Sequence, residues 1–347
     1  MPLEPFTAVV VASYGGPDGP DDVLPFLRNA TRGRGIPDER LAEVAEHYHL
    51  HGGRSPINAR NAELLDALRA ELRARGVDVP VVIGNRNWGP YLTDVVADLA
   101  DEGHTRVLGL ATSAYQSYSN CRQYWEDFTR ATDGQSIEVA KLDPFWDDPA
   151  FAEANARRVV AAWRGLRGGG VDGPVRLLFV THSIPASMDE RAGSGDPGDR
   201  YVAQHLVVAE RVAALAARAL DEEPTWELTY CSRSGPPRMP WLEPDVNDRI
   251  EDIAGDVAGV VLAPIGFIAD HMEVVHDLDT EAAATARRLG LAFARAGTVG
   301  TDEGFVGMLA DRLLARAACE RQGRTPKTRC RFDTGTCCQP PNPGART

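Results

Sequence analysis

Short apolar runs rich in β-branched residues alternate along the chain with stretches in which apolar residues recur every three or four positions. The first kind predicts buried strands, and the second kind predicts amphipathic helices. Strands and helices that alternate in this way are typical of βαβ units and a parallel sheet. The first strands expected are Thr7–Ala12, Val79–Gly84, Arg106–Thr112 and Ile137–Leu142. The helices expected among them are Pro20–Asn29, Asp38–His51, Asn58–Arg75 and Tyr91–Glu102.

The same alternation starts again after the glycine-rich stretch Gly165–Gly173, which we interpret as a linker between two similar halves. We expect an α/β protein whose halves span residues 1–165 and 174–300, each with a parallel four-stranded sheet flanked by helices. A last helix, Gly304–Ala318, and the tail to residue 347 are expected to pack back on the first half. The strands expected in the second half are Val175–Val180, Trp226–Tyr230, Gly259–Ile265 and Leu291–Ala296. Its long helices are expected at Asp199–Leu220 and His271–Leu289.

Composition narrows the class of protein. The chain has 347 residues, of which 43% are hydrophobic, enough for two domains with large cores. Its net charge of −13 argues against nucleic acid as a partner, because phosphate binding needs a basic face. No apolar run approaches the length of a transmembrane helix, and the first residues lack the basic segment of a signal peptide. We expect a cytoplasmic monomer that makes at most peripheral contact with a membrane.

A row of acids stands out in the second half. Glu273, Asp277 and Glu281 are four residues apart, so they share one face of the expected helix. No lysine or arginine lies between them, and the imidazoles of His271 and His276 are close in sequence. Carboxylates and imidazoles together suit a divalent metal in transit. The alternative is a solvated acidic face on an acidic protein.

His182 lies directly after the first expected strand of the second half, in the segment THSIP. Ligands of open α/β sheets collect at the carboxyl ends of strands, so a cleft between the halves is the expected site. A histidine with a pKa near neutrality and an acid on a facing helix, here Glu273, would form a proton-abstracting and metal-binding pair. The alternative is a histidine that only makes local hydrogen bonds.

Two loops of the first half, GNRNWGPY and ATSAYQSYSNCRQY, mix aromatic rings with hydroxyls, amides and arginine. Such surfaces suit a flat organic ligand that carries carboxylates, although ordinary loop packing explains them about as well. The sequences GxxxxGK[ST], GxGxxG, HExxH and GxSxG are all absent. Nucleotide binding is therefore disfavoured.

Four of the six cysteines lie in the last thirty residues, three of them in a polar tail rich in proline and glycine. Structural disulfides are not expected in a reducing cytosol. Because such a tail offers no core in which to bury a thiol, ligation of a metal or cluster is the leading interpretation. Cys231, at a strand end, is expected to be a buried thiol and not a ligand.

Seven segments occur in one order over about residues 7–300: SYGGP, HYHLHGGRSPIN, GNRNWGPY, ATSAYQSYSNCRQYWEDF, THSIP, YCSRSGPPRMPWLEPDV and PIGFIADHMEVVHDLDTE. Together they resemble the ferrochelatase family, and most closely its actinobacterial, coproporphyrin-using branch. This resemblance implies insertion of Fe(II) into a porphyrin during haem biosynthesis, and the branch it resembles uses coproporphyrin III and forms coproheme III. It also implies two Rossmann-like halves around a cleft.

The resemblance assigns roles to individual residues. His182 and Glu273 match the family's catalytic histidine and its acidic partner, and both would also contact the metal. Asp277 and Glu281 match the row of acids that guides the metal. Tyr14, in SYGGP, matches the residue that faces the metal from the opposite side of the porphyrin. Iron could arrive along the acidic row or past Tyr14, and the sequence leaves both routes open.

Other matches concern the porphyrin propionates. Ser55 and Tyr124 resemble residues that contact propionates in the coproporphyrin branch. One departure is that His47-Tyr48 stands where this branch usually has Arg-Tyr. Propionate anchoring there would be weaker or would come from other cations. The arginines that could provide it are Arg32, Arg34 and Arg54.

The resemblance also implies a [2Fe–2S] cluster, held by one thiolate from the YSxC loop and three from a C-terminal tail. Cys121 matches the first ligand. We expect Cys330, Cys337 and Cys338 to be the others, with Cys319 in reserve because adjacent ligands are geometrically awkward. The cluster could be structural or a sensor.

Three alternatives remain at this point. A ferrochelatase could prefer protoporphyrin IX, and a cobalt-inserting chelatase would share the fold but usually lacks a cysteine tail. A porphyrin or haem carrier could use His182 as an axial ligand without turnover. A carrier needs no row of acids, so Glu273, Asp277 and Glu281 favour an enzyme.

Overall fold

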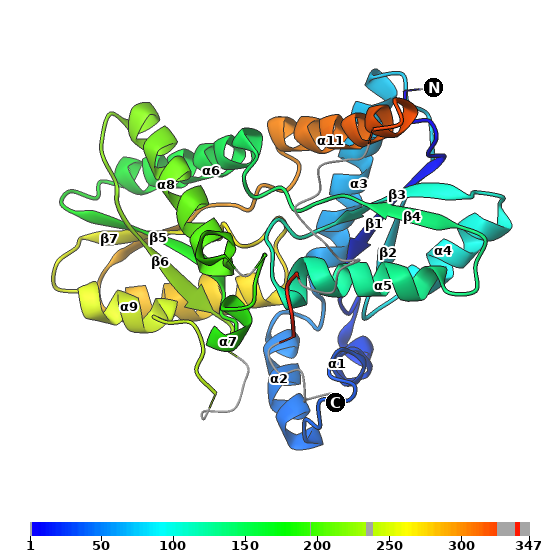
Figure 1. The fold of residues 1–347 in the computed structure, drawn as a ribbon. Coiled ribbons are helices and arrows are strands. Elements are labelled where there is room, and N and C mark those ends of the chain that lie inside the picture. Colours follow the sequence, from blue (N-terminus) through cyan, green and yellow to red (C-terminus); the bar gives the residue numbers. More distant parts are fainter. Residues whose placement is uncertain (1, 195, 234–238, 325–336, 341–347) are drawn as a thin grey trace.

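The computed structural model describes residues 2–194, 196–233, 239–324 and 337–340. Two parallel four-stranded sheets stand next to each other in the molecule (Figure 1). The first sheet has the order β2-β1-β3-β4, with β1 at its centre paired to β2 and β3. Its strands are β1 Ala8–Ser13, β2 Val81–Asn85, β3 Arg106–Ala111 and β4 Glu138–Lys141.

The second sheet repeats this arrangement with the order β6-β5-β7-β8. All its strand pairs are parallel, and β5 takes the central place that β1 has in the first sheet. Its strands are β5 Val175–His182, β6 Thr225–Cys231, β7 Gly259–Ala263 and β8 Ala292–Arg295. The predicted fold class, two similar α/β halves with parallel four-stranded sheets, is confirmed.

Helices cover both faces of the sheets, which explains why every residue of β1 and β7 is buried. Helices of the first half are α1 Val23–Ala30, α2 Asp38–Leu50, α3 Ile57–Ala74, α4 Leu92–Asp101 and α5 Gln123–Thr132. Helices α6 Pro149–Gly168, α7 Ala186–Asp189, α8 Tyr201–Leu220, α9 Val246–Ile253, α10 Ala283–Arg288 and α11 Glu303–Arg321 follow. Short 3₁₀ turns occupy Pro20–Asp22 (η1) and Pro197–Asp199 (η3), and π-helices occupy Tyr118–Arg122 (η2) and Val274–Ala282 (η4).

The expected linker Gly165–Gly173 is wrong in its first part. Helix α6, which the sequence patterns did not predict, continues through Gly165 and ends at Gly168. Buried Trp163 and Leu166 hold this end of the helix against the rest of the protein, and Gly169 follows as its cap. Only the residues after Gly168 connect α6 to β5.

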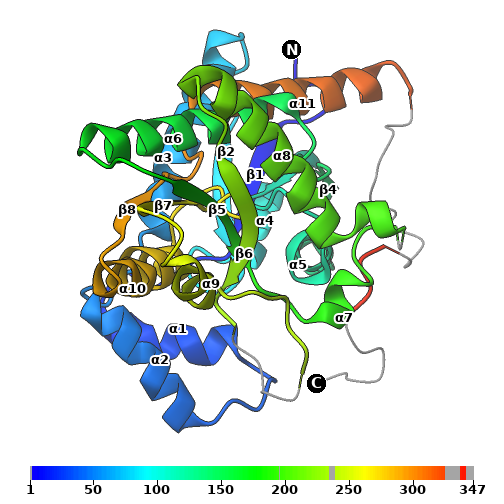
Figure 2. The same ribbon diagram turned by 90° about the vertical axis from the view of Figure 1, so that its left-hand side faces the viewer.

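The two halves share one core. A single cluster of buried side chains runs from Val9 in β1 through Trp163 in α6 to Leu177 in β5. Helix α11 crosses the top of the molecule and packs on α3 and α6 (Figures 1 and 2). The relative position of the sheets is therefore fixed by apolar burial. Within the described ranges, no helix has both the length and the apolar character needed to cross a membrane.

Candidate active site

The central strand of each sheet ends in a residue or loop that the sequence marked as functional. Strand β5 ends at His182, and Tyr14 directly follows the last residue of β1. The helical segment that carries Glu273 and the π-helix η4 comes after β7, the other neighbour of β5. The fold thus places these side chains at the carboxyl ends of the strands, where α/β proteins bind ligands.

His182 and Glu273 form the expected pair. His182 Nε2 lies 3.6 Å from Glu273 Oε2, and the two side chains are 30% and 50% exposed. Burial would lower the pKa of His182, but the nearby Glu273 carboxylate and a hydrogen bond to the backbone of Ser183 outweigh it, so the pKa is raised. Burial acts to raise the pKa of Glu273, yet the interactions with His182 lower it to about 2. The pair therefore favours an imidazolium beside a carboxylate.

The two nitrogens of His182 have different partners. Nδ1 faces the carbonyl oxygen of Ser183, to which a protonated Nδ1 donates a hydrogen bond. In the neutral ring this arrangement leaves the lone pair on Nε2, the nitrogen that faces Glu273. His271 approaches the same carboxylate oxygen, with Nδ1 3.8 Å from Glu273 Oε2. Glu273 thus contacts two imidazoles, and the sequence patterns did not predict the contact with His271.

Asp277 is the least solvated acid of the row. Burial raises its pKa to about 7, and the charges of Glu273 and Glu281 act in the same direction. Ser232 donates a hydrogen bond to Asp277 Oδ2. The backbone of Ser232 has a φ of 61°, in the left-handed region that few side chains adopt. Asp277 can therefore gain or lose a proton near neutral pH, next to the His182–Glu273 pair.

The three acids lie on or next to a π-helix, whereas the sequence predicted one regular helix over His271–Leu289. Segment η4 spans Val274–Ala282, and α10 continues from Ala283. π-Helical segments are rare and occur mostly at functional sites. At the outer end of the row, Glu281 Oε1 lies 3.5 Å from His276 Nε2.

Two tyrosines of the first half lie within reach of the charge on Glu273. Tyr14 is 39% exposed, and limited hydration together with the Glu273 carboxylate raises its pKa. The same causes raise the pKa of Tyr48, in α2. Both rings pack against the ring of Phe26, with centroids 6.2 Å away for Tyr14 and 6.0 Å away for Tyr48. Tyr14 and Tyr48 are thus both close enough to Glu273 to be affected by its charge. The role expected for Tyr14, opposite the metal, stays a prediction, and the sequence patterns did not single out Tyr48 as a site residue.

Ser55 and Tyr124 are buried, with 4% and 6% of their surface exposed. Ser55 packs against Gly16 so closely that a Cβ on that glycine would lie 2.6 Å from Ser55 Cβ. The ring of Tyr124 is covered by the guanidinium of Arg86, 4.3 Å from its centroid, and Arg86 binds Asp127. Their contact with a ligand stays a prediction, and the structure makes Arg86 a further candidate at this place.

The three candidate arginines are all exposed. Arg54 donates from Nε to the carbonyl oxygen of Asp18 at 2.8 Å, which positions it beside the loop after β1. The charge of Arg34 opposes the rise in the pKa of Tyr14, so this guanidinium also lies near Tyr14. Arg32 lies two residues before Arg34 in the segment after α1. The three candidate arginines therefore lie in the first half, whereas the row of acids from Glu273 to Glu281 lies in the second.

Three of the expected cluster ligands come together. Cys121 in η2, Cys337 and Cys338 form a buried cluster, with Sγ atoms of Cys121 and Cys338 3.6 Å apart and those of Cys337 and Cys338 3.7 Å apart. Cys330, the fourth expected ligand, lies outside the described residues. Cys319 lies in α11, and its thiol donates to the Arg324 carbonyl oxygen.

Among the described residues, no three or more histidine, cysteine, aspartate or glutamate side chains are already placed around one metal position. The thiols of Cys121, Cys337 and Cys338 lie close to one another without such an arrangement. Cys231 is buried, as expected, and burial raises the pKa of its thiol well above the usual value.

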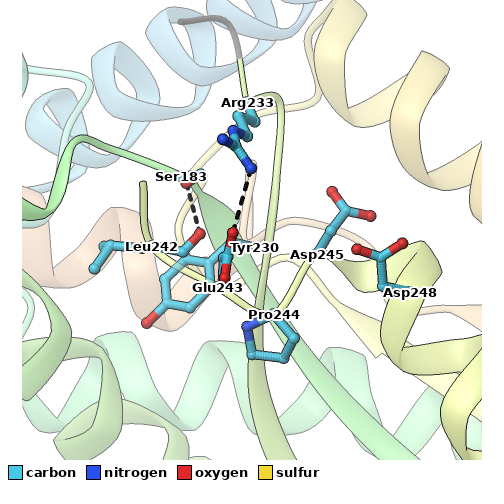
Figure 3. Close-up of a pocket in the computed structure, with 8 residues that line it drawn as sticks. All are labelled: Ser183, Tyr230, Arg233, Leu242, Glu243, Pro244, Asp245 and Asp248. Atoms are coloured by element: carbon cyan, nitrogen blue, oxygen red, sulfur yellow. Dashed lines mark hydrogen bonds and ion pairs between the residues drawn. The ribbon is translucent and has the colours of Figure 1, made fainter. Parts of the chain in front are cut away.

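A pocket of about 350 Å³ is lined by Ser183, the residue after His182, and by residues of the segment from Leu242 to Asp248 (Figure 3). Ser183 donates to the Leu242 carbonyl oxygen at 2.8 Å, and Arg233 forms an ion pair with Glu243 at 3.2 Å. The carboxylates of Asp245 and Asp248 also line the pocket. With these acids on its wall, the pocket is unsuited to an anionic ligand.

The site, with a histidine–glutamate pair, a row of acids and facing tyrosines on two parallel sheets, is that of a chelatase-type protein. The ferrochelatase family profile matches residues 6–317, and the chain belongs to this family. A coproporphyrin III ferrochelatase of Streptomyces coelicolor is 48% identical over 332 residues, which cover 92% of this chain and 88% of that protein. One of Nocardia farcinica is 43% identical, covering 96% of each chain.

Solved structures support the fold. SirB from Bacillus subtilis with Fe³⁺ superposes with a TM-score of 0.53 at 12% identity, over 91% of this chain and 98% of that one. The sirohydrochlorin chelatase SirB in complex with cobalt, from Bacillus subtilis subspecies spizizenii, gives a TM-score of 0.50, also at 12% identity, over 91% and 97% of the two chains. At this identity the similarity concerns the arrangement of sheets and helices alone.

Proposed function

We propose that this ferrochelatase inserts Fe(II) into coproporphyrin III to give coproheme III in haem biosynthesis. The observation that carries the proposal is the His182–Glu273 pair, with Nε2 3.6 Å from Oε2, at the inner end of the acidic row. Related proteins named coproporphyrin III ferrochelatase align with more than nine-tenths of this chain. An enzyme of this kind must remove two pyrrole protons and bring a desolvated metal ion to the ring.

In the proposed mechanism His182 is the first proton acceptor. Its Nε2 lone pair takes a pyrrole proton, and the imidazolium that forms is stabilised by the Glu273 carboxylate. Asp277, with its pKa raised to about 7, can then accept the proton and release it to solvent near neutral pH. Loss of the second pyrrole proton by the same route leaves the dianionic ring that holds Fe(II). Tyr14 would contact the ring or the metal from the other side, a role supported by its position within reach of the Glu273 charge.

The row from Glu273 through Asp277 to Glu281 is the proposed path of Fe(II). Carboxylate oxygens replace part of the hydration shell of a divalent cation as it moves inward. The competing route past Tyr14 crosses exposed arginines, including Arg34, whose charge disfavours a cation. We therefore favour the acidic route.

A carrier that binds porphyrin or haem without turnover is the second candidate from another class. It would need His182 as an axial ligand, but not a carboxyl with a pKa near neutrality four residues from Glu273. An anaerobic assay with Fe(II) and porphyrin, followed by absorbance, separates the two functions. We expect multiple turnovers for an enzyme, and one equivalent of bound porphyrin without metallation would refute the proposal.

The preference for coproporphyrin III rests on the exposed cations of the first half. Arg32, Arg34 and Arg54 are exposed and can meet propionates, of which coproporphyrin III has four and protoporphyrin IX two. We expect a higher kcat/KM for coproporphyrin III. A higher value for protoporphyrin IX would reverse this assignment, and faster insertion of Co(II) than of Fe(II) would favour a cobalt chelatase.

We also propose that Cys121, Cys330, Cys337 and Cys338 hold a [2Fe–2S] cluster, which would act as a structural crosslink or a redox sensor. The close approach of the three described thiols supports it. Two thiolates on one tetrahedral metal lie about 3.8 Å apart for bonds of about 2.3 Å, and Cys338 Sγ lies 3.6 Å from that of Cys121 and 3.7 Å from that of Cys337. Because each iron of such a cluster takes two protein thiolates, only one of these neighbours would share an iron with Cys338. Anaerobically purified protein should show visible absorption and two irons per chain, and colourless, iron-free protein would refute the cluster.

Three further properties belong to this proposal. The described cysteines form no disulfide, which suits the reducing cytoplasm. The protein is proposed to be a monomer, to be tested by light scattering. We keep 1–165 and 174–300 as working limits of the two halves, with the tail from about residue 300 assigned to the first.

A further inference from the structure

Three histidines from two separate elements meet at the outer end of the acidic row. His47 lies in the last turn of α2, His51 caps the same helix four residues later, and His276 lies in η4. The rings of His47 and His276 stack with centroids 4.0 Å apart, and the ring of His51 lies 5.8 Å from His276 at right angles. Figure 2 shows α2 beside α10, which continues η4. We call these three residues the histidine trio.

His276 is buried without satisfying its polar atoms. Its surface is only 6% exposed, and within the described chain neither ring nitrogen makes a hydrogen bond. Glu281 Oε1 stands 3.5 Å from Nε2, outside hydrogen-bond geometry. Burying a polar nitrogen without a partner costs free energy, so such a group calls for an additional ligand.

The chemistry of the trio suits a metal ion. A neutral imidazole has a lone pair on one ring nitrogen, which makes histidine a common metal ligand. Two histidines at positions i and i+4 of a helix are a common metal-binding pair. Imidazole nitrogens with one carboxylate suit the divalent ions of iron, cobalt, nickel and zinc.

We propose that His47, His51 and His276 form a capture site that binds a divalent transition-metal ion before it enters the acidic row. Glu281 connects the capture site to the acidic row, because it contacts His276 and is the outermost acid of the row. This inference rests on the proposed function and deepens it, since it assigns a loading site for the Fe(II) substrate. The rings are now stacked, so the half-exposed His47 and His51 must rotate about their side-chain bonds to turn nitrogens toward one ion.

The histidines also join α2 to η4, and Thr280 Oγ1 lies 3.4 Å from His51 Nε2. A purely structural contact would stabilise the protein equally with and without metal. A capture site would stabilise it further only when metal is added, because a ligand that binds the folded state shifts the unfolding equilibrium. Metal-dependent stabilisation therefore distinguishes the two roles.

The test is an anaerobic titration of the full, cluster-loaded protein with Co(II), followed by visible absorption and equilibrium dialysis. We expect wild-type protein to bind Co(II) at two sites, one of which weakens at least about tenfold in the double variant His47→Ala/His51→Ala. His49→Ala is the matched control, because His49 is an exposed histidine on the same helix and outside the trio. The control should bind Co(II) as the wild type does.

Two further measurements complete the test. Co(II) should raise the melting temperature of the double variant less than that of His49→Ala, and the KM for Fe(II) should rise only in the double variant. If Co(II) affinity, stoichiometry and stabilisation are the same in both variants, the capture site is refuted. That outcome leaves the proposed function standing, because insertion activity is tested independently by His182→Ala.

Discussion

The loops after β1 and β5 occupy equivalent places, since each strand is the second in a sheet of the same order. After β1 the chain continues with Tyr14 and two glycines, and after β5 it ends the strand with His182 and continues with Ser183. The first half thus presents aromatic rings and exposed guanidinium groups, while the second presents the His182–Glu273 pair and Asp277. In the proposed function, the first half binds the porphyrin and the second exchanges its protons.

The difference has a physical cause in the neighbours of each loop. Tyr14 and Tyr48 keep their protons, because limited hydration and the charge of Glu273 both raise their pKa values. In the second half, the opposite charges of His182 and Glu273 stabilise each other, and Asp277 is left with a pKa near neutrality. Five substitutions test this division of labour, in order of decreasing effect.

His182→Ala should lower the steady-state rate of metal insertion at least about 10²-fold, the usual scale for loss of a positioned acid–base group. Tyr14→Phe, at the equivalent place of the first half, should lower it less than about tenfold. Porphyrin binding, measured by fluorescence quenching, should remain in both variants. A larger loss in Tyr14→Phe than in His182→Ala would reverse the roles of the halves.

Glu273→Gln should lower the insertion rate roughly tenfold and shift its pH dependence. His182 must be unprotonated to accept a pyrrole proton, so activity rises with pH through the pKa of this histidine. Removing the Glu273 charge removes the main cause that raises this pKa. The acidic limb of the kcat/KM profile should therefore move to lower pH, and an unmoved limb would exclude Glu273 as the partner of His182.

Cys338→Ser should bleach the protein and lower its melting temperature by several degrees, as expected for loss of a long-range crosslink. Cys338 connects both halves, because its thiol lies 3.6 Å from that of Cys121 and it exchanges hydrogen bonds with Gly193. Cys121→Ser and Cys330→Ser should behave alike. Cys231→Ser is the control and should keep the colour. If Cys319→Ser bleached the protein and Cys338→Ser did not, Cys319 would replace Cys338 in the proposed ligand set.

Asp277→Asn should change the pH dependence of stability. Burial raises the pKa of Asp277 from its usual value of about 4 to about 7 in the folded protein. The folded state therefore holds this proton more tightly than the unfolded state does. The resulting contribution to the free energy of unfolding is complete below about pH 4 and is lost as pH rises through 7. An asparagine keeps the acceptor for Ser232 and has no charge to bury. Relative to wild type, the variant should gain roughly 1 kcal/mol or more between pH 4 and pH 8 in denaturant unfolding. A pH-independent difference would show that Asp277 ionises normally.

Arg54→Ala should have the smallest effect, a rise of about threefold in the KM for coproporphyrin III, because an exposed ion pair contributes at most about 1 kcal/mol. Arg32→Ala should behave similarly, whereas the KM for protoporphyrin IX should change less. Equal changes for both porphyrins would indicate that these arginines do not distinguish the propionates.

The sequence determined the elements whose burial follows a local pattern. The eight strands lie within a few residues of their predicted places, because β-branched runs report burial on both faces of a sheet. The spacing of Glu273, Asp277 and Glu281 put them on one side of a helix whether its turns are α or π. The ordered segments also identified the family, which the match over residues 6–317 confirms.

Other features depended on contacts between distant parts of the chain. The π-helical turns, the placement of His271 against Glu273 and the hydrogen bond from Ser232 to Asp277 follow no local period. Helix α6 was missed because its glycine-rich end resembles a linker, whereas burial of its apolar side chains keeps it helical.

Only the tertiary structure brings the histidine trio and the cysteines together. His47 and His276 are separated by more than two hundred residues, as are Cys121 and Cys338, yet their side chains touch. Sequence periodicity states which face of an element is buried, but not which other element buries it. That choice was made by the shared core, whose packing fixes one half against the other and so decides which polar groups meet.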